Sequence, residues 1–189
     1  MQTDPAVMAF LLSRRSRPAK MLDPPVPTEP DLRPLITAAA RVPDHGKLEP
    51  WRFIVLARTA CVALAGEVGA RAVALGLDDA AQQKASEPFA KAHLIVTVVA
   101  SPKPSEKIPA IEQTLSAGAV CLGLVNAALA SGWGANWLSG WPAHDRAVQE
   151  FLGLDAHELV AGFIHLGTAR ATPPERPRPD ITALTEWRR

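Results

Sequence analysis

The sequence predicts an α+β fold in which helices dominate and cover a sheet. Three short segments rich in apolar and β-branched residues indicate strands, namely residues 52–57, 93–100 and 159–166. Segment 93–100 (HLIVTVVA) is apolar along nearly its whole length, which is typical of a strand covered on both faces. Helix-forming segments separate the strands, and 189 residues with 48% hydrophobic content fit a single domain, residues 1–189.

Capping signals and apolar spacing predict the helices of the first hundred residues. Asp4 and Pro5 are typical of a helix start, and an apolar stripe follows over residues 7–12. Thr28 and Asp31 form a start of the capping-box type, followed by leucines at helical spacing. We therefore expect helices over residues 5–15, 29–42, 60–75 and 80–91.

The longest predicted helix opens at Pro109 and extends to about Ser131. Residues 114–141 carry no formal charge and no proline. Serine, asparagine and a Gly-Trp-Gly sequence interrupt this apolar run, whereas a membrane span needs about twenty mostly apolar residues in a row. We therefore expect a buried core helix and no membrane partner.

The last fifty residues predict alternating short elements and an arm. We expect a strand over 135–138 and a helix over 143–151 before the strand at 159–166. Prolines then lead to residues 181–187, which indicate a terminal strand with no later element to cover it. Because an unpaired strand tends to add to another sheet, we expect residues 170–189 to form an extended arm that crosses to a partner subunit.

Composition excludes several classes of function. Twenty Lys and Arg residues against nineteen Asp and Glu residues leave too little positive charge for nucleic acid as a partner. No signal-peptide pattern opens the chain, so we expect a cytoplasmic protein. Cys61 and Cys121 are interpreted as small buried hydrophobes, and His93 and His165 as core or strand-end residues. The histidine spacing predicts no metal site, and there is no P-loop, complete dinucleotide fingerprint or serine-hydrolase elbow.

Three local patches suggest a ligand. Residues 14–17 (RRSR) place cations at a helix end, where they either complement the helix dipole or bind an anion such as phosphate. Residues 43–51 form a polar loop ending in Trp51, which is either a plain connection packed on the core or part of a site. Residues 132–140 crowd glycines and indoles where a flat ligand could approach the backbone.

In order and spacing, these patches resemble the FMN-dependent nitroreductases, and within them the small single-domain NAD(P)H nitroreductases. Residues 14–16 resemble the family's opening Arg-Arg-Ser. Residues 43–45 and 49–53 resemble its Pro-Asp-His and its Gln-Pro-Trp-Arg-Phe. Residues 112–118 are similar to the start of its long central helix, and residues 162–168 to its last core strand. The resemblance covers nearly the whole chain.

The resemblance implies a mixed sheet flanked by helices and an intertwined homodimer with an exchanged C-terminal strand. It also implies FMN at the subunit interface, bound by residues of both chains. The positions that match FMN contacts are Arg14, Arg15, Ser16, His45, Glu49, Trp137, Leu138 and Ser139, and Arg176 and Arg178 match a basic pair near the phosphate in larger members. The positions that match a nicotinamide nucleotide segment are Ala127, Ala128, Leu129, Ala130, Ser131 and Gly132.

The implied activity is hydride transfer from NAD(P)H to flavin N5, followed by reduction of an electron-poor small molecule such as a nitroaromatic or quinone. No catalytic side chain is required. The alternatives are a non-catalytic FMN carrier or sensor and a purely structural domain. Glu49 stands where the family usually has Gln, and Leu138 where relatives can carry Arg. Both departures make the expected pocket less positive.

Overall fold

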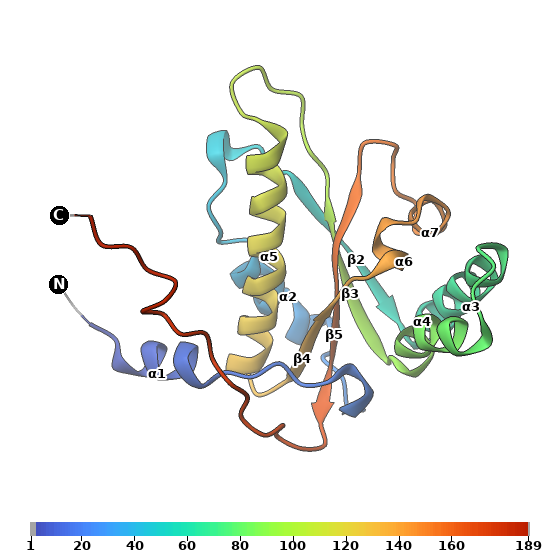
Figure 1. The fold of residues 1–189 in the computed structure, drawn as a ribbon, viewed down its shortest axis with the longest axis horizontal. Coiled ribbons are helices and arrows are strands. Elements are labelled where there is room, and N and C mark those ends of the chain that lie inside the picture. Colours follow the sequence, from blue (N-terminus) through green and yellow to red (C-terminus); the bar gives the residue numbers. More distant parts are fainter. Residues whose placement is uncertain (1–2, 189) are drawn as a thin grey trace.

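A computed structural model describes residues 3–188 and confirms the α+β class (Figure 1). The sheet has five strands: β1 (Leu22–Asp23), β2 (Trp51–Ala57), β3 (Leu94–Ala100), β4 (Gly134–Leu138) and β5 (Leu159–Ala169). Strands β1, β5, β3 and β2 lie in that order, and β4 also pairs with β5. All four pairings are antiparallel, so within the described residues the sheet is not the mixed sheet we expected.

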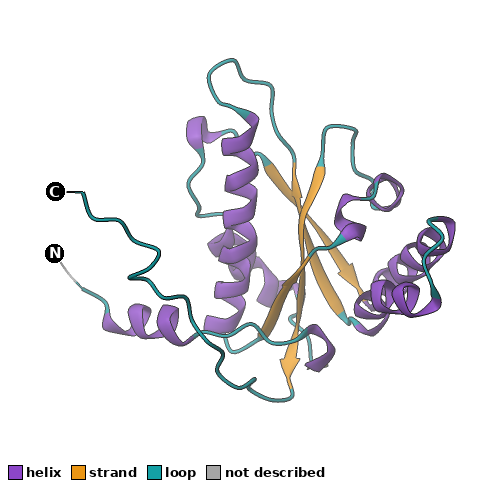
Figure 2. Cartoon of the chain, viewed as in Figure 1, coloured by secondary structure: helices purple, strands orange, loops and turns teal. Residues whose placement is uncertain are grey.

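Residues 3–188 form seven α-helices, and all but α1 lie against one side or the other of the sheet (Figure 2). On one side lie α2 (Glu29–Ala39) and α5 (Ala110–Ala130), and on the other lie α3 (Arg58–Ala74), α4 (Asp79–Lys91), α6 (Trp141–His144) and α7 (Arg146–Phe151). Helix α1 (Pro5–Ser13) stands apart from the sheet. The helices expected in the first half and the long helix from Pro109 are thereby confirmed, with ends shifted by a few residues.

Strand β3 shows why both faces of the sheet are covered. All seven of its residues are buried. Val96 and Val98 belong to the core cluster with α2 and α5, whereas Ile95 and Val99 belong to the cluster with α3 and α4. Successive side chains of a strand point to opposite faces, so a strand buried on both sides is continuously apolar. The interpretation of residues 93–100 is confirmed.

Helix α5 is the expected core helix on one side only, because eight of its 21 residues are buried. Among the described helices it alone is long and apolar enough to cross a membrane, judged by length and composition. It packs against α2, where the backbone of Ala39 lies 3.1 Å from the place of a Cβ on Gly123. A larger residue at Gly123 would push the two helices apart.

One predicted helix is divided. Residues 143–151 were expected to form a single helix, but Asp145 separates α6 from α7. Its backbone is extended (φ −78°, ψ 126°), and its carboxylate accepts a hydrogen bond from Val148 N at 3.2 Å, which caps α7. The same carboxylate pairs with Arg71 Nε of α3 at 2.8 Å. Asp145 therefore caps α7 locally and also forms a tertiary ion pair with Arg71, and the helix is interrupted at this residue.

The terminal strand does not form within the chain. Residues 181–184 make a turn, and residues 185–188 have no regular structure. Figure 1 shows residues 170–188 running beside α1, away from the sheet. Their apolar side chains are exposed to 67% at Ile181, 72% at Leu184 and 82% at Trp187. A segment with this pattern gains stability only when another surface covers it.

Helix α1 is also uncovered. None of its residues is buried, and Leu12 is 74% exposed. Its start nevertheless agrees with the prediction, because Asp4 accepts hydrogen bonds from Ala6 N at 3.1 Å and Val7 N at 3.3 Å. On α5, Ile111, Leu115 and Leu122 are exposed to 62%, 65% and 45% and share one side of the helix. Both helices therefore present apolar faces outward.

Cys61 and Cys121 are small buried residues, and His165 is a core residue, as the sequence predicted. Both thiols are fully buried, and burial raises the pKa of Cys61 to about 11 and that of Cys121 to about 12. His165 lies on β5 with its Nε2 buried and unpartnered, and burial lowers its pKa to about 4. These groups are inert core residues at neutral pH.

An ion pair between the half-exposed Arg52 and the buried Glu158 links β2 to the start of β5. Arg52 donates to both carboxylate oxygens of Glu158, at 2.8 and 2.6 Å, and the Glu158 side chain is only 3% exposed. The hydrogen bond from Arg52 is the main reason why the pKa of Glu158 falls to about 2. The pair thus contributes stability above about pH 4.5, the ordinary pKa of Glu, and loses it as the pH falls toward 2.

We therefore expect Arg52→Met to lower the free energy of unfolding at pH 7 by about 1–2 kcal/mol, since it leaves the buried Glu158 carboxylate without its half-exposed partner. The difference from the unchanged protein should shrink as the pH falls from about 4.5 to 2. Protonation of His165, whose pKa is lowered by burial, also destabilises the folded state in acid. This effect is the same in both proteins and does not contribute to the difference between them. Urea unfolding at pH 7 and pH 3 measures the difference. A gap that stays constant with pH would contradict this assignment.

Candidate functional site

Five polar side chains from the two ends of the chain meet beside α1. Arg14, Arg15, Ser16, Arg176 and Arg178 line one cavity of about 130 Å³. Arg14 Nη2 donates to Ser16 Oγ at 3.1 Å, while Arg14 Nε is buried without a partner among the described residues. Burial, and then the positive charges of Arg178 and Arg176, lower the pKa of Arg14. We call these five residues the arginine cradle.

A carboxylate already lies between two of the cradle's guanidinium groups. Glu175 Oε1 is 3.6 Å from Arg15 Nη1 and 2.9 Å from Arg178 Nε. Arg15 also donates to the carbonyl of Pro174, which fastens the arm to the residues after α1. The Glu175 side chain is 62% exposed, so an anion with more charge and more acceptor oxygens can replace it from the solvent side. The cradle therefore fits a phosphate group.

Strand β4 connects the cradle to a second cavity. Arg17 N donates to Ala135 O at 2.8 Å, and Asn136 Nδ2 donates to Arg17 O at 2.8 Å. The cradle segment is thus fastened to the beginning of β4. From Gly134 to Leu138 the strand spans roughly 13 Å, at ~3.3 Å per residue. A ligand that binds the cradle and lies along β4 reaches the end of the strand.

The end of β4 opens into an apolar cleft of about 520 Å³. Leu138 and Ser139 line it together with Gly140, whose φ of +80° turns the chain toward α6. Trp137 points to the opposite face of the strand, where its indole covers the place that a Cβ on Gly162 would take. The structure thus brings Leu138 and Ser139 together and separates the side chain of Trp137 from them.

His45 and Glu49 lie in a constrained loop before β2. Gly46, Lys47 and Glu49 have φ values of +71°, +54° and +48°. The Asp44 carboxylate stabilises this conformation by accepting from Leu48 N at 3.1 Å and Glu49 N at 2.8 Å. Residues held in the left-handed region store strain, and such strain is concentrated at functional sites.

This loop is fastened to the first turns of α5. His45 Nδ1 lies 2.7 Å from Glu112 Oε2, and both side chains are accessible. Trp51 Nε1 donates to Ser116 Oγ at 3.2 Å, and Ser116 Oγ donates to Pro43 O at 2.8 Å. Trp51 is therefore packed against α5, as we expected of a plain connecting loop. The side chains of His45, which is paired with Glu112, and of Glu49 are both exposed to solvent.

The two halves of the expected site lie at opposite ends of α5. The loop with His45 contacts its first turn, whereas Gly132 follows its last turn and lines a cavity of about 580 Å³ with Arg14 and Arg17. At ~1.5 Å per residue, the 21 residues of α5 separate the two places by about 30 Å. Figure 1 shows the loop at one end of α5 and α1 at the other. One chain alone does not bring His45 and Glu49 to the arginine cradle.

The segment expected to bind a nicotinamide nucleotide is the last turn of α5 and the residues after it. Ala128 is fully buried, and Leu129 and Gly132 line the cavity shared with Arg14 and Arg17. Gly132 has a φ of +85°, which ends the helix. Arg17, absent from the expected contacts, belongs to this cavity. Its position directly after Ser16 in the RRSR patch is the signal that could have indicated it.

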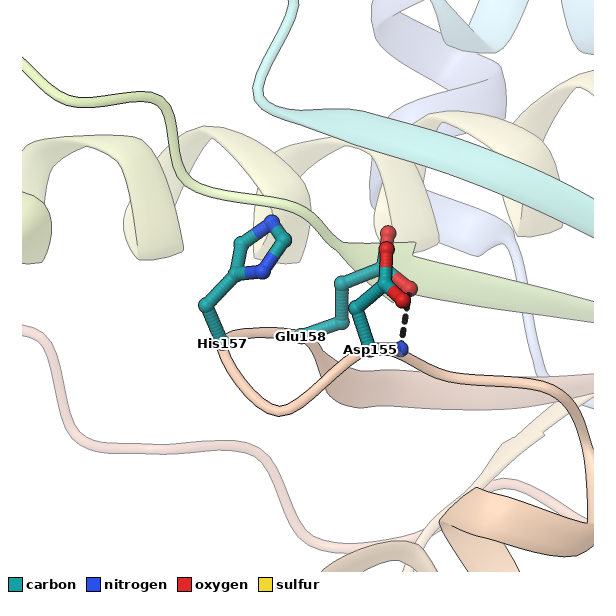
Figure 3. Close-up of side chains that lie close together, drawn as sticks. All are labelled: Asp155, His157 and Glu158. Carbon is teal, nitrogen blue, oxygen red and sulfur yellow. Dashed lines mark hydrogen bonds between the residues drawn. The ribbon is translucent and has the colours of Figure 1, made fainter.

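A second group of polar side chains, shown in Figure 3, has a structural explanation. One ligand atom each of Asp155, His157 and Glu158 lies within 4.8 Å of the others. Glu158 already accepts hydrogen bonds from Arg52 and, at 3.0 Å, from Asp155 N. Its oxygens are therefore committed to the turn that leads into β5, and we assign no metal site to this group.

The antiparallel sheet covered by helices on both faces places the chain in the α+β class, and comparison gives the family. The model of the Nitroreductase family matches residues 11–168. The chain belongs to the nitroreductase family, as the resemblance of its motifs indicated.

Two curated relatives extend this result. The Escherichia coli K12 protein named "Putative NAD(P)H nitroreductase YdjA" is 35% identical over 161 residues, which cover 85% of this chain and 87% of that protein. The Haemophilus influenzae protein named "Putative NAD(P)H nitroreductase" is 34% identical over 162 residues, with the same coverage of 85% and 87%.

Solved structures share the fold. A nitroreductase-like protein from Bacillus cereus has a TM-score of 0.81 at 20% identity and covers 99% of this chain and 98% of its own. A nitroreductase from Desulfovibrio desulfuricans, solved in complex with FMN, has a TM-score of 0.75 at 20% identity and covers 99% of both chains. At this level of identity the likeness shows the fold alone.

Proposed function

We propose that this protein is an FMN-dependent oxidoreductase that uses NAD(P)H to reduce an electron-poor small molecule. The observation that carries the proposal is the connection of the arginine cradle by β4 to the apolar cleft at Leu138 and Ser139. FMN has a phosphate at one end and a flat isoalloxazine ring at the other, and a ribityl chain joins them. The name of the Escherichia coli relative supports NAD(P)H as the reductant.

In this proposal the chain's own residues bind and orient. Arg14, Arg15 and Ser16, with Arg176 and Arg178, hold the phosphate of FMN, and Leu138 and Ser139 contact its ring. When bound, FMN supplies the redox chemistry, taking a hydride from NAD(P)H and passing electrons to an acceptor such as a nitroaromatic or quinone. Residues 127–132 contribute to the nicotinamide nucleotide site, which Arg14 and Arg17 make positive. No side chain acts as nucleophile or general base.

We infer that the complete site belongs to a homodimer. His45 and Glu49 lie about 30 Å from the cradle along α5, and a second copy packed antiparallel would bring its loop to the first copy's cradle. The exposed apolar residues Ile111, Leu115 and Leu122 supply a contact surface on α5 for this packing. Helix α1, which buries nothing within the chain, supplies another.

A receiving surface for the partner's arm is also present. β2 ends the strand order at one edge of the sheet, and Val55 on it is 47% exposed. An apolar groove of about 620 Å³ runs between this edge and α2, lined by Leu32 and Ile36 among others. We propose that residues 181–187 of the partner add to this edge, which would cover the groove and the arm's apolar side chains together.

The experiment that tests the function uses the purified protein with its bound flavin. Added NADH or NADPH should bleach the flavin absorbance without oxygen, and a quinone should restore it. A non-catalytic FMN carrier or sensor would keep its colour in the presence of either nucleotide. A structural domain would be colourless, and FMN would not raise its melting temperature. A cytoplasmic location remains a prediction from the sequence.

Glu49 should lower the midpoint potential of the flavin. Its carboxylate, supplied by the partner, would repel the electron density of reduced FMN. Glu49→Gln should therefore raise the midpoint potential at neutral pH by roughly tens of millivolts while FMN affinity changes less, because the cradle is intact. Redox titrations of the two proteins at neutral pH measure the difference. Equal potentials would place Glu49 away from the flavin.

A further inference from the structure

The apolar cleft at the end of β4 extends beyond the strand to other elements. Its other wall is α4, and its rim continues to the first residues of α6. The lining residues are Leu77, Ala81, Lys84, Ala85, Pro88, Phe89, Leu138, Ser139, Gly140, Trp141 and Pro142. A cleft of about 520 Å³ with one phenyl ring and one indole in its walls suits an aromatic ring of a small ligand.

One positive charge stands in this lining. Lys84 is the only charged residue among the eleven, and within residues 3–188 its ammonium makes no ion pair and no hydrogen bond. The other lysine of α4 differs, because Lys91 pairs with Glu87 one turn earlier on the same helix. Lys84 is exposed and lines the apolar cleft, so its ammonium is accessible to an anionic group of a bound ligand.

The cleft adjoins the proposed ring site. Leu138 and Ser139 line it and are also the residues that we propose to contact the flavin ring. Gly140, at φ +80°, exposes its backbone beside them. The next residue, Trp141, is the first residue of α6. A small molecule in the cleft would therefore lie next to the ring from which electrons leave.

We propose that this cleft admits an aromatic electron acceptor that carries a carboxylate, and that Lys84 pairs with that carboxylate. The proposal rests on the proposed function and specifies its acceptor class. For a carboxylated quinone, the acceptor gains two electrons and two protons and becomes the hydroquinone. NAD(P)H supplies a hydride through the flavin and solvent supplies the second proton, so NAD(P)+ is the other product.

The physical reason for selectivity is the contrast between one cation and apolar walls. An uncharged polar substituent entering the cleft would lose water without a charged partner, whereas a carboxylate gains Lys84. The aromatic ring packs on the apolar walls for either type of ligand, so ring binding and charge recognition can be measured separately.

The test uses benzoate and benzamide, which have the same ring and differ in charge, with the FMN-loaded protein. Isothermal titration should show benzoate binding more tightly than benzamide at low salt. Lys84→Met, which keeps the side-chain length, should weaken benzoate binding about three- to tenfold and leave benzamide unchanged. Lys91→Met, on the same helix but outside the cleft, should change neither. The preference for benzoate should decrease as salt is added, because the Lys84 contact is exposed.

Equal affinity of the unchanged protein for both probes, or an equal loss for both in Lys84→Met, would overturn the proposal. So would an unchanged benzoate affinity in that variant. Binding of the probes does not require turnover, so these outcomes are independent of whether NAD(P)H reduces the flavin. With 4-nitrobenzoate and 4-nitrobenzamide as acceptors, Lys84→Met should raise KM for the acid alone and leave kcat unchanged.

Discussion

Removing residues 173–189 should convert a dimeric, FMN-loaded protein into a largely monomeric, colourless one. The arm carries Arg176 and Arg178 of the cradle, and each charge-assisted contact to a phosphate contributes roughly 1.5–3 kcal/mol. FMN affinity should therefore fall by at least about a hundredfold. The apolar side chains of the arm, exposed in the single chain, are those expected to hold the partner. Light scattering measures the mass, and visible absorbance measures the flavin content.

Two sets of substitutions separate the arm's contribution to FMN binding from its contribution to the dimer. Arg176→Ala with Arg178→Ala should release FMN and leave the dimer largely intact, because the apolar anchors remain. Ile181→Ser with Trp187→Ser should weaken the dimer while the cradle within each chain is unchanged. A truncated protein that stays dimeric with full flavin occupancy would refute the exchange of the arm.

Arg14→Ala should raise the FMN dissociation constant by roughly ten- to a hundredfold, equivalent to about 1.5–3 kcal/mol of lost charge-assisted bonding. Arg14 is the cradle residue with a buried, unpartnered Nε, and burial with neighbouring arginines lowers its pKa. A bound anion would give Arg14 Nε a hydrogen-bond partner and would offset the repulsion between the neighbouring arginines. Fluorescence titration of the protein, freed of cofactor, with FMN measures the constant.

Riboflavin is the matched control for Arg14, because it has the same ring and no phosphate. Its affinity should change little in Arg14→Ala. If FMN and riboflavin lose affinity equally, Arg14 supports the fold at the end of α1 and complements its dipole, as the first interpretation of the RRSR patch allowed.

Local patterns predicted most elements because their causes are local. Asp4 caps α1 as expected, and the Thr28 backbone N–H and hydroxyl both bond Asp31, at 2.9 and 2.7 Å. Continuous burial of β3 follows from its composition alone. The two-residue strand β1 was missed, because two residues carry no periodicity and only pairing with Thr168 and Ala169 makes them a strand. The break at Asp145 was missed because its ion pair with Arg71 is tertiary.

For the candidate site, the sequence by itself determined which residue types are present and that the chain belongs among the nitroreductases. Only the tertiary structure decided that Arg176 and Arg178 lie beside Arg14, more than 150 residues away in the chain. It also decided that Glu49 lies at the far end of α5 from them, so that one chain holds two separated halves of a site. The physical reason is that helix-capping hydrogen bonds and apolar periodicity involve residues close together in the chain. Tertiary packing, in contrast, decides which distant segments meet.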